Sequence, residues 1–315
     1  MKSNLSTTQY VILFMWCWVL SGCKKDIHFP EGHCYTQQEL PQNFNLIEPQ
    51  GKLFYYKYPV FNPGNNNEFL CLQINQSASN YNLVSYNIAT TTKHEIYGGA
   101  GTKPASWSIK DWVAFEMGGD IYKVKSNGDS LVQLTFSGQE ILPVWNKVGT
   151  GVAVTHHGNS NTFHVLDEEG LLAINLNIDI PNSFSWGKQN GLLAYGSGTR
   201  IFTAVVAPFQ PQGYAIQGIT STGCVCWLDS NTILYSLDNN IYKLSIPGGS
   251  ISLLKQGCAN KSYDALSVSG DGEKILVAVK ETKVDYDNKV FIDNDAFYLM
   301  NADGSNETRI ELPIQ

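Results

Sequence analysis

Three closely spaced histidines are the first candidates for chemistry in this sequence, because imidazole nitrogens are common ligands of transition metals. His156 and His157 are adjacent, and His164 follows a few residues later. Neighbouring residues on a strand point to opposite faces of a sheet, so His156 and His157 cannot both ligate one ion without a bulge. We therefore expect no metal site here, and nothing else in the sequence implies a cofactor.

A second group of candidate ligands lies between residues 281 and 295, where Asp285, Asp287, Asp293 and Asp295 alternate with other residues. Carboxylates at alternating positions are suitable ligands for Ca²⁺. The spacing lacks the glycine turn of a calcium-binding loop, however. A solvated acidic hairpin is the favoured interpretation, with calcium binding as the alternative.

The cysteines raise the question of disulfide bonds, which an exported chain permits. Cys224 and Cys226 alternate along a predicted strand and share a face, which is poor geometry for bridging each other. Cys258 lies in the loop that leads into the next repeat, on the side where the strand of Cys224 begins. The sequence therefore suggests a Cys224–Cys258 disulfide. The cysteine spacing does not match a zinc site.

Linear catalytic motifs are absent from the sequence, which contains no Gly-x-Ser-x-Gly, His-Glu-x-x-His or Gly-x-x-x-x-Gly-Lys-Ser/Thr. Gly99-Ala100-Gly101 lacks the third glycine of a dinucleotide site. We therefore expect a non-catalytic protein. The alternative is a carbohydrate lyase or hydrolase whose catalytic residues come from several repeats around a central channel. The presence of only two arginines, Arg200 and Arg309, argues against that alternative.

The elements that would position all these residues form a repeat. A bulky apolar residue recurs in the same local context, at steps of 46, 38, 41, 41 and 41 residues. The six positions are Phe61, Trp107, Trp145, Trp186, Trp227 and Val268. A period of about 40–45 residues with an aromatic at a fixed phase is typical of a β-propeller. Each aromatic is interpreted as core packing between blades, because such side chains bury about 150–250 Å².

One repeat shows the internal pattern of a blade. Residues 104–108, 112–116, 120–125 and 131–136 are predicted strands, and Asn127-Gly128 is suited to a tight hairpin turn. Six such units between about residue 56 and the C-terminus predict an all-β, six-bladed propeller of four-stranded antiparallel blades. The ring can close in two ways. Either the last blade is complete by itself, which we favour, or a strand at 52–57 joins it.

The repeat resembles that of the TolB-type six-bladed propeller. The match rests on Trp107-Ser108, on Asp120-Ile121-Tyr122, and on the turns at residues 268–272 and 300–305. It covers residues 56–315 and implies the propeller fold. Residues 24–55 are too few for the separate N-terminal domain of TolB, so the resemblance is to the propeller alone.

The N-terminus resembles that of a bacterial lipoprotein. Residues 10–20 are an unbroken apolar stretch, shorter than the roughly 20 residues that span a bilayer and typical of a secretory signal. Leu20-Ser21-Gly22-Cys23 resembles a lipobox, whose cysteine is lipidated. We expect a signal peptide over 1–22, a lipidated N-terminus and tether over 23–55, and a propeller over 56–315. Lys24-Lys25 after Cys23 resembles lipoproteins that reach the outer membrane, facing either the periplasm or the cell surface.

The overall charge limits the class of partner. The chain carries a formal net charge of −7 and has a pI near 5.4. Nucleic acid is not expected as a partner, because its binding requires a basic surface that displaces phosphate counterions. The sequence thus predicts a lipid-anchored binding module for a protein or glycan of the bacterial cell envelope. The expected binding loops precede Trp107, Trp145, Trp186, Trp227 and Val268, at one end of the channel.

Overall fold

The structure is a computed structural model that describes most of the chain. The described residues are 34–36, 38, 46–47, 53–75, 80–158, 161–176, 183–188, 191–207, 210–215, 224–284 and 290–313. The expected signal peptide and lipidation site, Cys23, lie outside them. Among the described residues, no helix has the length and apolar character needed to cross a bilayer.

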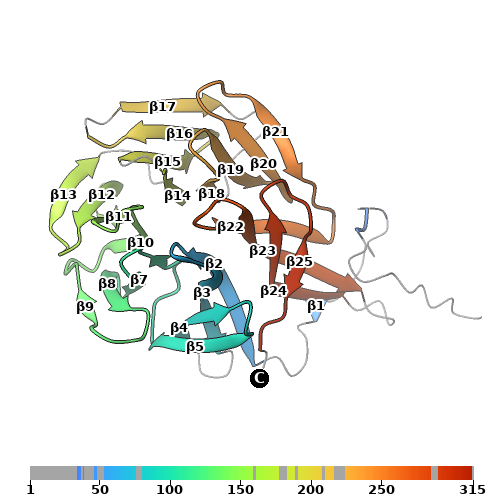
Figure 1. Ribbon diagram of the computed structural model, residues 1–315, viewed down its shortest axis with the longest axis horizontal. Helices are drawn as coiled ribbons and strands as arrows, with labels where there is room; N and C mark the ends of the chain where they lie inside the picture. The colour runs from blue at the N-terminus through green and yellow to red at the C-terminus, as the bar shows by residue number, and fades with distance from the viewer. Residues whose placement is uncertain are drawn as a thin grey trace, which may run out of the picture.

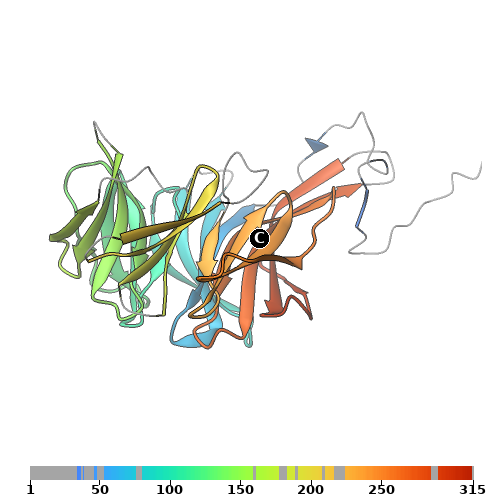
Figure 2. The same ribbon diagram turned by 90° about the horizontal axis from the view of Figure 1, so that it is seen from above.

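The described chain forms six four-stranded antiparallel blades around a common axis, as Figures 1 and 2 show. Blade 1 contains β2 (Phe54–Asn62), β3 (Asn65–Asn75), β4 (Asn80–Asn87) and β5 (Thr92–Gly98), and blade 2 contains β6 (Ser106–Trp107), β7 (Trp112–Met117), β8 (Asp120–Lys125) and β9 (Val132–Gln133). Blade 3 contains β10 (Glu140–Trp145), β11 (Gly151–His157), β12 (Asn161–Asp167) and β13 (Leu172–Leu176), and blade 4 contains β14 (Ser183–Trp186), β15 (Leu192–Ser197), β16 (Arg200–Val205) and β17 (Gln210–Ala215). Blade 5 contains β18 (Val225–Trp227), β19 (Thr232–Leu237), β20 (Asn240–Ser245) and β21 (Ile251–Lys255), and blade 6 contains β22 (Lys261–Val268), β23 (Lys274–Val284), β24 (Val290–Asn301) and β25 (Thr308–Ile310). The prediction of an all-β, six-bladed propeller is confirmed.

Each blade is buried on both faces because it is sandwiched between its neighbours. Consecutive residues of β7, Val113, Ala114 and Phe115, are all buried, although successive side chains on a strand point to opposite faces. Within the blades, tight turns join consecutive strands into hairpins. The turn predicted at Asn127-Gly128 is one example, and Gly128 has a φ of 89° there. Local turn chemistry thus makes the blades, and apolar burial between blades assembles the ring.

A serine hydroxyl links neighbouring blades at the innermost strands. The residue before the repeat aromatic of one blade accepts a hydrogen bond from the backbone N–H of the repeat aromatic in the next blade. The three such bonds run from Trp145 to Ser106 (2.9 Å), from Trp227 to Ser185 (3.3 Å) and from Phe61 to Ser267 (2.9 Å). The Ser-Trp pairs of the sequence repeat therefore connect blades as well as fill the core.

Blade 6 meets blade 1 at what we call the seam, where the described residues of the predicted 52–57 strand stay in blade 1. β2 pairs with β3 inside blade 1, and blade 6 is complete with β22–β25 from the C-terminal part of the chain. The favoured mode of closure is thus the one observed. The backbone N–H of Gly270 donates to Asn66 Oδ1 at 3.0 Å. A Cβ at Gly270 would lie 2.4 Å from the Pro63 carbonyl oxygen, so this close approach requires glycine.

The N-terminal segment is attached to blade 6 rather than being a plain tether. Cys34 forms a disulfide with Cys258, and Tyr35 N–H donates to Asn260 Oδ1 at 2.8 Å. The short strand β1 (Leu46–Ile47) pairs in parallel with β24. The segment that precedes the propeller in the sequence therefore contacts blade 6, the last blade. The chain then enters the ring in blade 1, where β2 begins at Phe54.

The predicted Cys224–Cys258 disulfide is wrong. Cys224 is a free cysteine that directly precedes β18, the innermost strand of blade 5. Its sulfur accepts a hydrogen bond from the backbone N–H of Leu266 at 3.3 Å. Cys258 lies in the turn before β22, where the next residue, Ala259, donates its N–H to the carbonyl of Tyr35. Sequence order placed Cys224 and Cys258 in neighbouring repeats. In the folded chain, Cys258 instead faces the N-terminal segment.

Candidate functional site: the mouth of the central channel

The six innermost strands enclose a central cavity of about 660 Å³. Every blade contributes to its wall, and the lining includes apolar, hydroxyl and charged side chains. Cavities of this size that are mainly apolar with a few placed polar groups are typical ligand sites. The channel is therefore the first place to look for binding.

The innermost strands run in the same direction, so the channel has two distinct ends. Val225 N–H donates to Ser183 Oγ at 3.0 Å, and two residues further along both strands Trp227 N–H donates to Ser185 Oγ. We call the end where the strands start the mouth. It is formed by Tyr58, Pro104, Leu142, Ser183, Cys224 and Asp264. The other end is bordered by the exposed lysines Lys147 and Lys188.

Among the described non-glycine residues with a positive φ, only Tyr58 and Leu142 lie inside strands, and both are at the mouth, whereas the others lie in turns and loops elsewhere. Tyr58 and Leu142 have φ values of 56° and 55°, and each precedes a proline. Positive φ in a non-glycine residue costs on the order of 1–3 kcal/mol and persists only where the surroundings enforce it. The strand register shifts at both places, and it shifts again in blade 6 between Tyr263 and Leu266, next to Asp264. Such bulges redirect side chains and often lie next to functional sites.

The mouth presents a neutral phenol beside a carboxylate. Burial raises the pKa of Tyr58, and the nearby Asp264 carboxylate raises it further. Tyr58 therefore stays protonated and can donate a hydrogen bond, while the exposed Asp264 can accept one. Among the described residues that line the cavity, Asp264 is the only carboxylate, and the lining contains neither histidine nor arginine.

Burial disfavours ionisation of the two cysteine thiols of the wall. Burial is the largest influence on both, and it raises the pKa of Cys224 to about 12 and also raises that of Cys226. The thiolate is the nucleophile and metal-binding form of cysteine, so neither side chain is available for such chemistry at neutral pH.

The repeat aromatics lie between the blades, with part of each at the cavity wall. Phe61 and the four tryptophans are 3–5% exposed, whereas Val268 is half-buried. Trp186 packs against Phe163, Phe184 and Leu193 in one hydrophobic cluster. Its indole N–H donates to the Val144 carbonyl of the preceding blade at 3.1 Å. The position that defines the repeat thus supports the wall on which the mouth is built.

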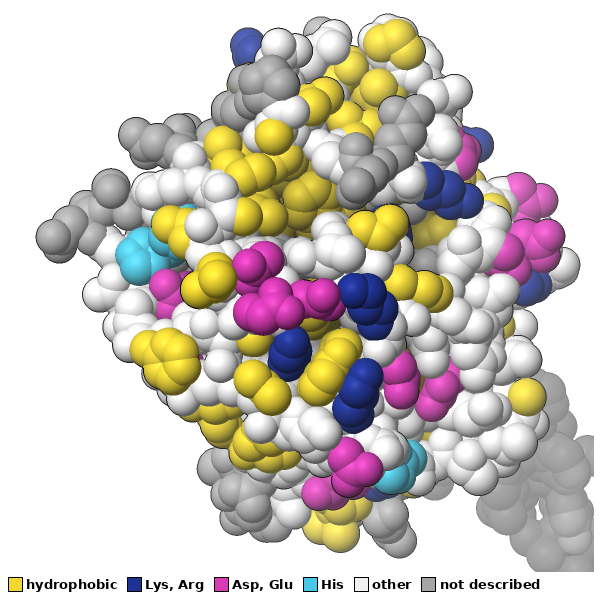
Figure 3. Space-filling model, turned by 60° about the vertical axis from the view of Figure 1, so that its left-hand side comes forward, with side chains coloured by type: hydrophobic (Ala, Val, Ile, Leu, Met, Phe, Trp, Pro, Cys, Tyr) yellow, Lys and Arg dark blue, Asp and Glu magenta, His cyan; other side chains and the backbone are white. Residues whose placement is uncertain are grey.

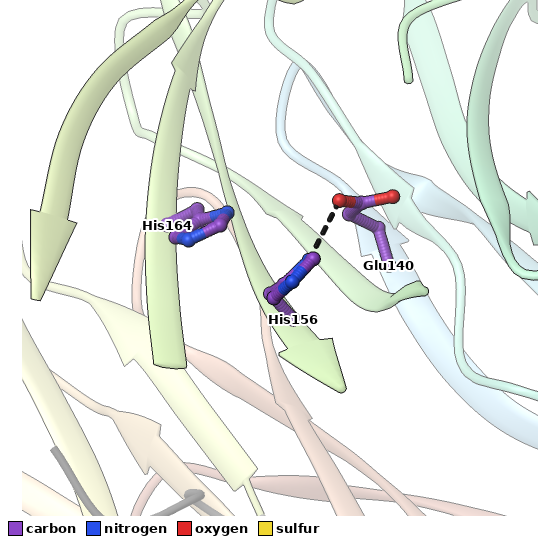
Figure 4. A group of neighbouring side chains, drawn as sticks. All are labelled: Glu140, His156 and His164. Carbon is purple, nitrogen blue, oxygen red and sulfur yellow. Dashed lines mark hydrogen bonds and ion pairs between the residues drawn. The ribbon is translucent and has the colours of Figure 1, made fainter. Parts of the chain in front are cut away.

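The structure brings two of the three histidines together with a carboxylate that sequence reasoning missed. Glu140, His156 and His164 lie on three adjacent strands of blade 3, and one ligand atom from each lies within 4.8 Å of the others (Figure 4). His157 does not belong to this cluster. The register decides this pairing: His156 is opposite Thr162, so His164, two residues further along β12, faces the same side of the sheet.

The other expected ligand group cannot be assembled from the described side chains. Asp285 and Asp287 lie outside the described residues, and for Asp293 and Asp295 only the backbone of β24 is described. Glu281 is buried in the same blade, where its carboxylate accepts the Arg309 guanidinium at 3.1 Å. Arg309 thus forms an ion pair within blade 6 and does not line the cavity.

The surface on the side of blades 2 and 3 mixes both charges. Figure 3 shows lysine and arginine side chains next to acidic ones on this face, with no extended basic patch among the described residues. The Lys110–Glu168 ion pair (2.8 Å) is one example. Lys125 lies over the Trp112 ring, 4.1 Å from its centroid. Lysines here are engaged with acidic or aromatic neighbours.

Comparison with known proteins identifies the fold alone. No protein-family model matches the chain, and no curated protein matches it. Among solved structures, the chain is similar to one from a nidogen/laminin complex, with a TM-score of 0.54, 12% identity, and coverage of 65% of this chain and 81% of that chain. It is also similar to the β-propeller domain of the Trilobed protease from Pyrococcus furiosus, with a TM-score of 0.53, 11% identity, and coverage of 82% and 98%. Likeness at this identity establishes a β-propeller.

Proposed function

We propose that the protein is a non-catalytic, lipid-anchored binding module of the bacterial cell envelope, whose channel mouth receives a protein or glycan partner. The observation that carries the proposal is the mouth itself. It combines two positive-φ residues within strands, three register shifts and the neutral Tyr58 near the Asp264 carboxylate, at one end of a cavity that every blade lines. Backbone strain of this kind is retained mainly where function requires it.

The remaining support comes from the sequence. The Leu20-Ser21-Gly22-Cys23 segment supports acylation at Cys23, and the Trp-Ser and Asn-Ala-Asp-Gly motifs of the repeat resemble those of TolB-type propellers. Two or more acyl chains hold a protein firmly at a membrane, since each buried CH₂ contributes about 0.8 kcal/mol. The absence of histidine and arginine from the described cavity wall favours binding over hydrolysis.

The decisive experiment is capture from detergent-solubilised envelope with the full chain as bait, combined with a glycan array. Asp264→Lys reverses the charge at the mouth, and Lys147→Glu reverses a charge at the other end. Both residues are exposed, so both variants are expected to fold. Asp264→Lys should reduce partner retention at least about tenfold, whereas Lys147→Glu should retain it. Equal retention by both variants would place binding elsewhere.

The anchor has its own test. Cys23→Ala should move the protein from the membrane fraction to the soluble fraction in the native host, and mass spectrometry should detect acyl chains on wild-type Cys23 only. A variant that remains in the membrane fraction would contradict lipid anchoring without affecting the binding proposal.

A further inference from the structure

We propose that Glu140, His156 and His164 bind a divalent first-row transition-metal ion, with Zn²⁺ as the reference. The proposal rests on the side-chain arrangement within blade 3 and is independent of the proposed partner binding. Glu140 begins β10, His156 lies near the end of β11, and His164 lies in the middle of β12.

The strand register places all three side chains on one face. Glu140 is directly opposite His156 in the β10–β11 pair. His156 is opposite Thr162 in the β11–β12 pair, so His164, two residues further along, is its diagonal neighbour on the same face. Diagonal neighbours are within reach of long and aromatic side chains. The two imidazole rings accordingly stack with centroids 4.7 Å apart.

The donor set fits a transition metal better than calcium or magnesium. Two imidazole nitrogens and one carboxylate oxygen form a set that Zn²⁺ and its first-row neighbours accept, whereas Ca²⁺ and Mg²⁺ require oxygen ligands. Three protein ligands leave a coordination position for water. Figure 4 shows a ring nitrogen of each histidine directed toward the carboxylate, which is the arrangement that a shared ion would need.

The ligands are held by neighbouring hydroxyl groups. Ser137 Oγ donates to Glu140 Oε2 at 2.7 Å, which leaves Oε1 on the side of His156, whose Nδ1 is 2.8 Å away. The Thr162 hydroxyl lies 3.0 Å from His164 Nε2. Hydrogen bonds of this type orient metal ligands in established sites, and their loss weakens metal binding about 10–100-fold.

Glu140 is a buried carboxylate with little compensating charge. Its side chain is 7% exposed, and among the described residues His156 is its only ion-pair partner. A buried carboxylate is costly unless it is paired with a cation or coordinates a metal. A divalent ion between Glu140 and the two histidines would supply that charge.

The surroundings leave room for the small movement that coordination requires. Ligand atoms about 2.0–2.1 Å from a tetrahedral ion lie about 3.3 Å apart, so His156 Nδ1 must move away from Glu140 Oε1, which is 2.8 Å from it, and the His156 ring must turn. A Cβ at Gly158 would lie 2.8 Å from His156 Nε2. Because glycine stands there, the ring edge is free of that contact. His156 is also partly exposed, which gives an ion access from solvent.

The test is isothermal titration calorimetry of the full chain in detergent, without a histidine tag and after chelator treatment, with ZnCl₂ as titrant. Wild type should bind one Zn²⁺ per chain, and Co²⁺ should give visible d–d absorption bands. His164→Ala and His156→Ala should weaken Zn²⁺ binding at least about tenfold. The matched control, His157→Ala, removes the adjacent histidine outside the cluster and should bind as wild type does.

Glu140→Gln and His164→Gln keep the approximate side-chain shape and serve if an alanine variant does not fold. Both should lose the Zn²⁺-induced rise in melting temperature that we expect for wild type. CaCl₂ should produce no such rise. The proposal is overturned if wild type binds no stoichiometric Zn²⁺, or if His164→Ala and His164→Gln bind it as tightly as His157→Ala does, since the ion would then be bound elsewhere.

Discussion

The seam between blades 6 and 1 and the interface between blades 3 and 4 both pack the apolar faces of two neighbouring blades together. The two interfaces differ in whether the blades are consecutive in the chain. Blades 3 and 4 follow each other along the chain, whereas blades 6 and 1 are its two ends. Both interfaces nevertheless bury an edge-to-face phenylalanine pair. Phe69 and Phe297 have ring centroids 5.8 Å apart at the seam, and Phe163 and Phe184 have centroids 5.1 Å apart at the inner interface. The same kind of aromatic contact therefore forms between blades that are consecutive in the chain and between blades that are not.

The seam differs in what surrounds this shared core. Hydroxyl groups of blade 1 bind the C-terminal tail, with Tyr86 donating to the Glu311 carbonyl at 3.0 Å and Tyr56 donating to that of Pro313. The Cys34–Cys258 disulfide joins the segment before blade 1 to the turn before blade 6. The C-terminal tail thus crosses onto blade 1 at the seam, while the N-terminal segment is crosslinked to the turn before blade 6 and adds β1 to the sheet of that blade.

The largest expected effect comes from removing one ring of each aromatic pair. Phe297→Ala and Phe163→Ala both truncate fully buried side chains. Each should lower the free energy of unfolding by about 3–5 kcal/mol, through lost burial and the cavity left behind. Urea denaturation followed by tryptophan fluorescence measures both. A much smaller loss for Phe297→Ala would show that the seam is open in solution.

The disulfide between the N-terminal segment and the turn before blade 6 should stabilise the folded protein. We expect the double variant Cys34→Ser/Cys258→Ser to lose about 2–4 kcal/mol of unfolding free energy, because the crosslink restricts the unfolded chain over a separation of 224 residues. Thermal unfolding with and without reductant measures the effect, and the variant itself should be insensitive to reductant. Cys71→Ser, which alters a free cysteine, is the control for reductant effects. Unchanged stability of the double variant would mean that the segment contributes nothing to ring closure.

The serine links allow a finer comparison. Ser267→Ala leaves the buried Phe61 N–H at the seam without its acceptor, and Ser185→Ala does the same to Trp227 at an inner interface. An unsatisfied buried donor costs about 1–3 kcal/mol, so similar losses are expected. Chemical denaturation of the two variants side by side tests this. A loss confined to Ser185→Ala would show that water or another group reaches Phe61 at the seam.

The smallest effect concerns acid sensitivity, which we expect at the contact of blades 5 and 6 rather than at the seam. Burial tends to raise the pKa of Glu307, but Lys261 (2.9 Å), together with Tyr263 and Lys255, outweighs this and lowers it. A lowered folded-state pKa contributes stability above the ordinary value of 4.5 that is lost as the pH falls through the folded pKa.

Glu307→Gln should therefore cost about 1 kcal/mol at pH 7, and the difference from wild type should shrink below about pH 4.5. Thermal unfolding at several pH values measures it. Glu311→Gln, at an exposed position, is the matched control and should show little change. A wild-type advantage that persists at pH 3 would contradict the assigned role of Glu307.

The sequence was sufficient for the architecture because a blade is a local object. Its four strands are consecutive, its turns carry their own signals, and the aromatic phase recurs at about 41 residues, so the number of blades could be counted before any contact was known. The core position could also be predicted, because a bulky apolar residue, usually tryptophan, recurs at the same phase of each repeat. The bulges at Tyr58 and Leu142 were not readable, since either residue followed by proline is compatible with an ordinary extended strand.

Contacts that depend on which distant segments meet were decided only by the tertiary structure. Cys258 had several partners open to it in sequence, and the N-terminal segment reached it only because the ring brings the two chain ends together. Glu140 likewise joined the histidines through the pairing of three strands, whose register is set by burial of the opposite faces. A repeated sequence pattern specifies local units such as strands and turns. Which different residues meet across neighbouring strands, or between distant segments, depends on the packing of the whole chain and is encoded in no single segment.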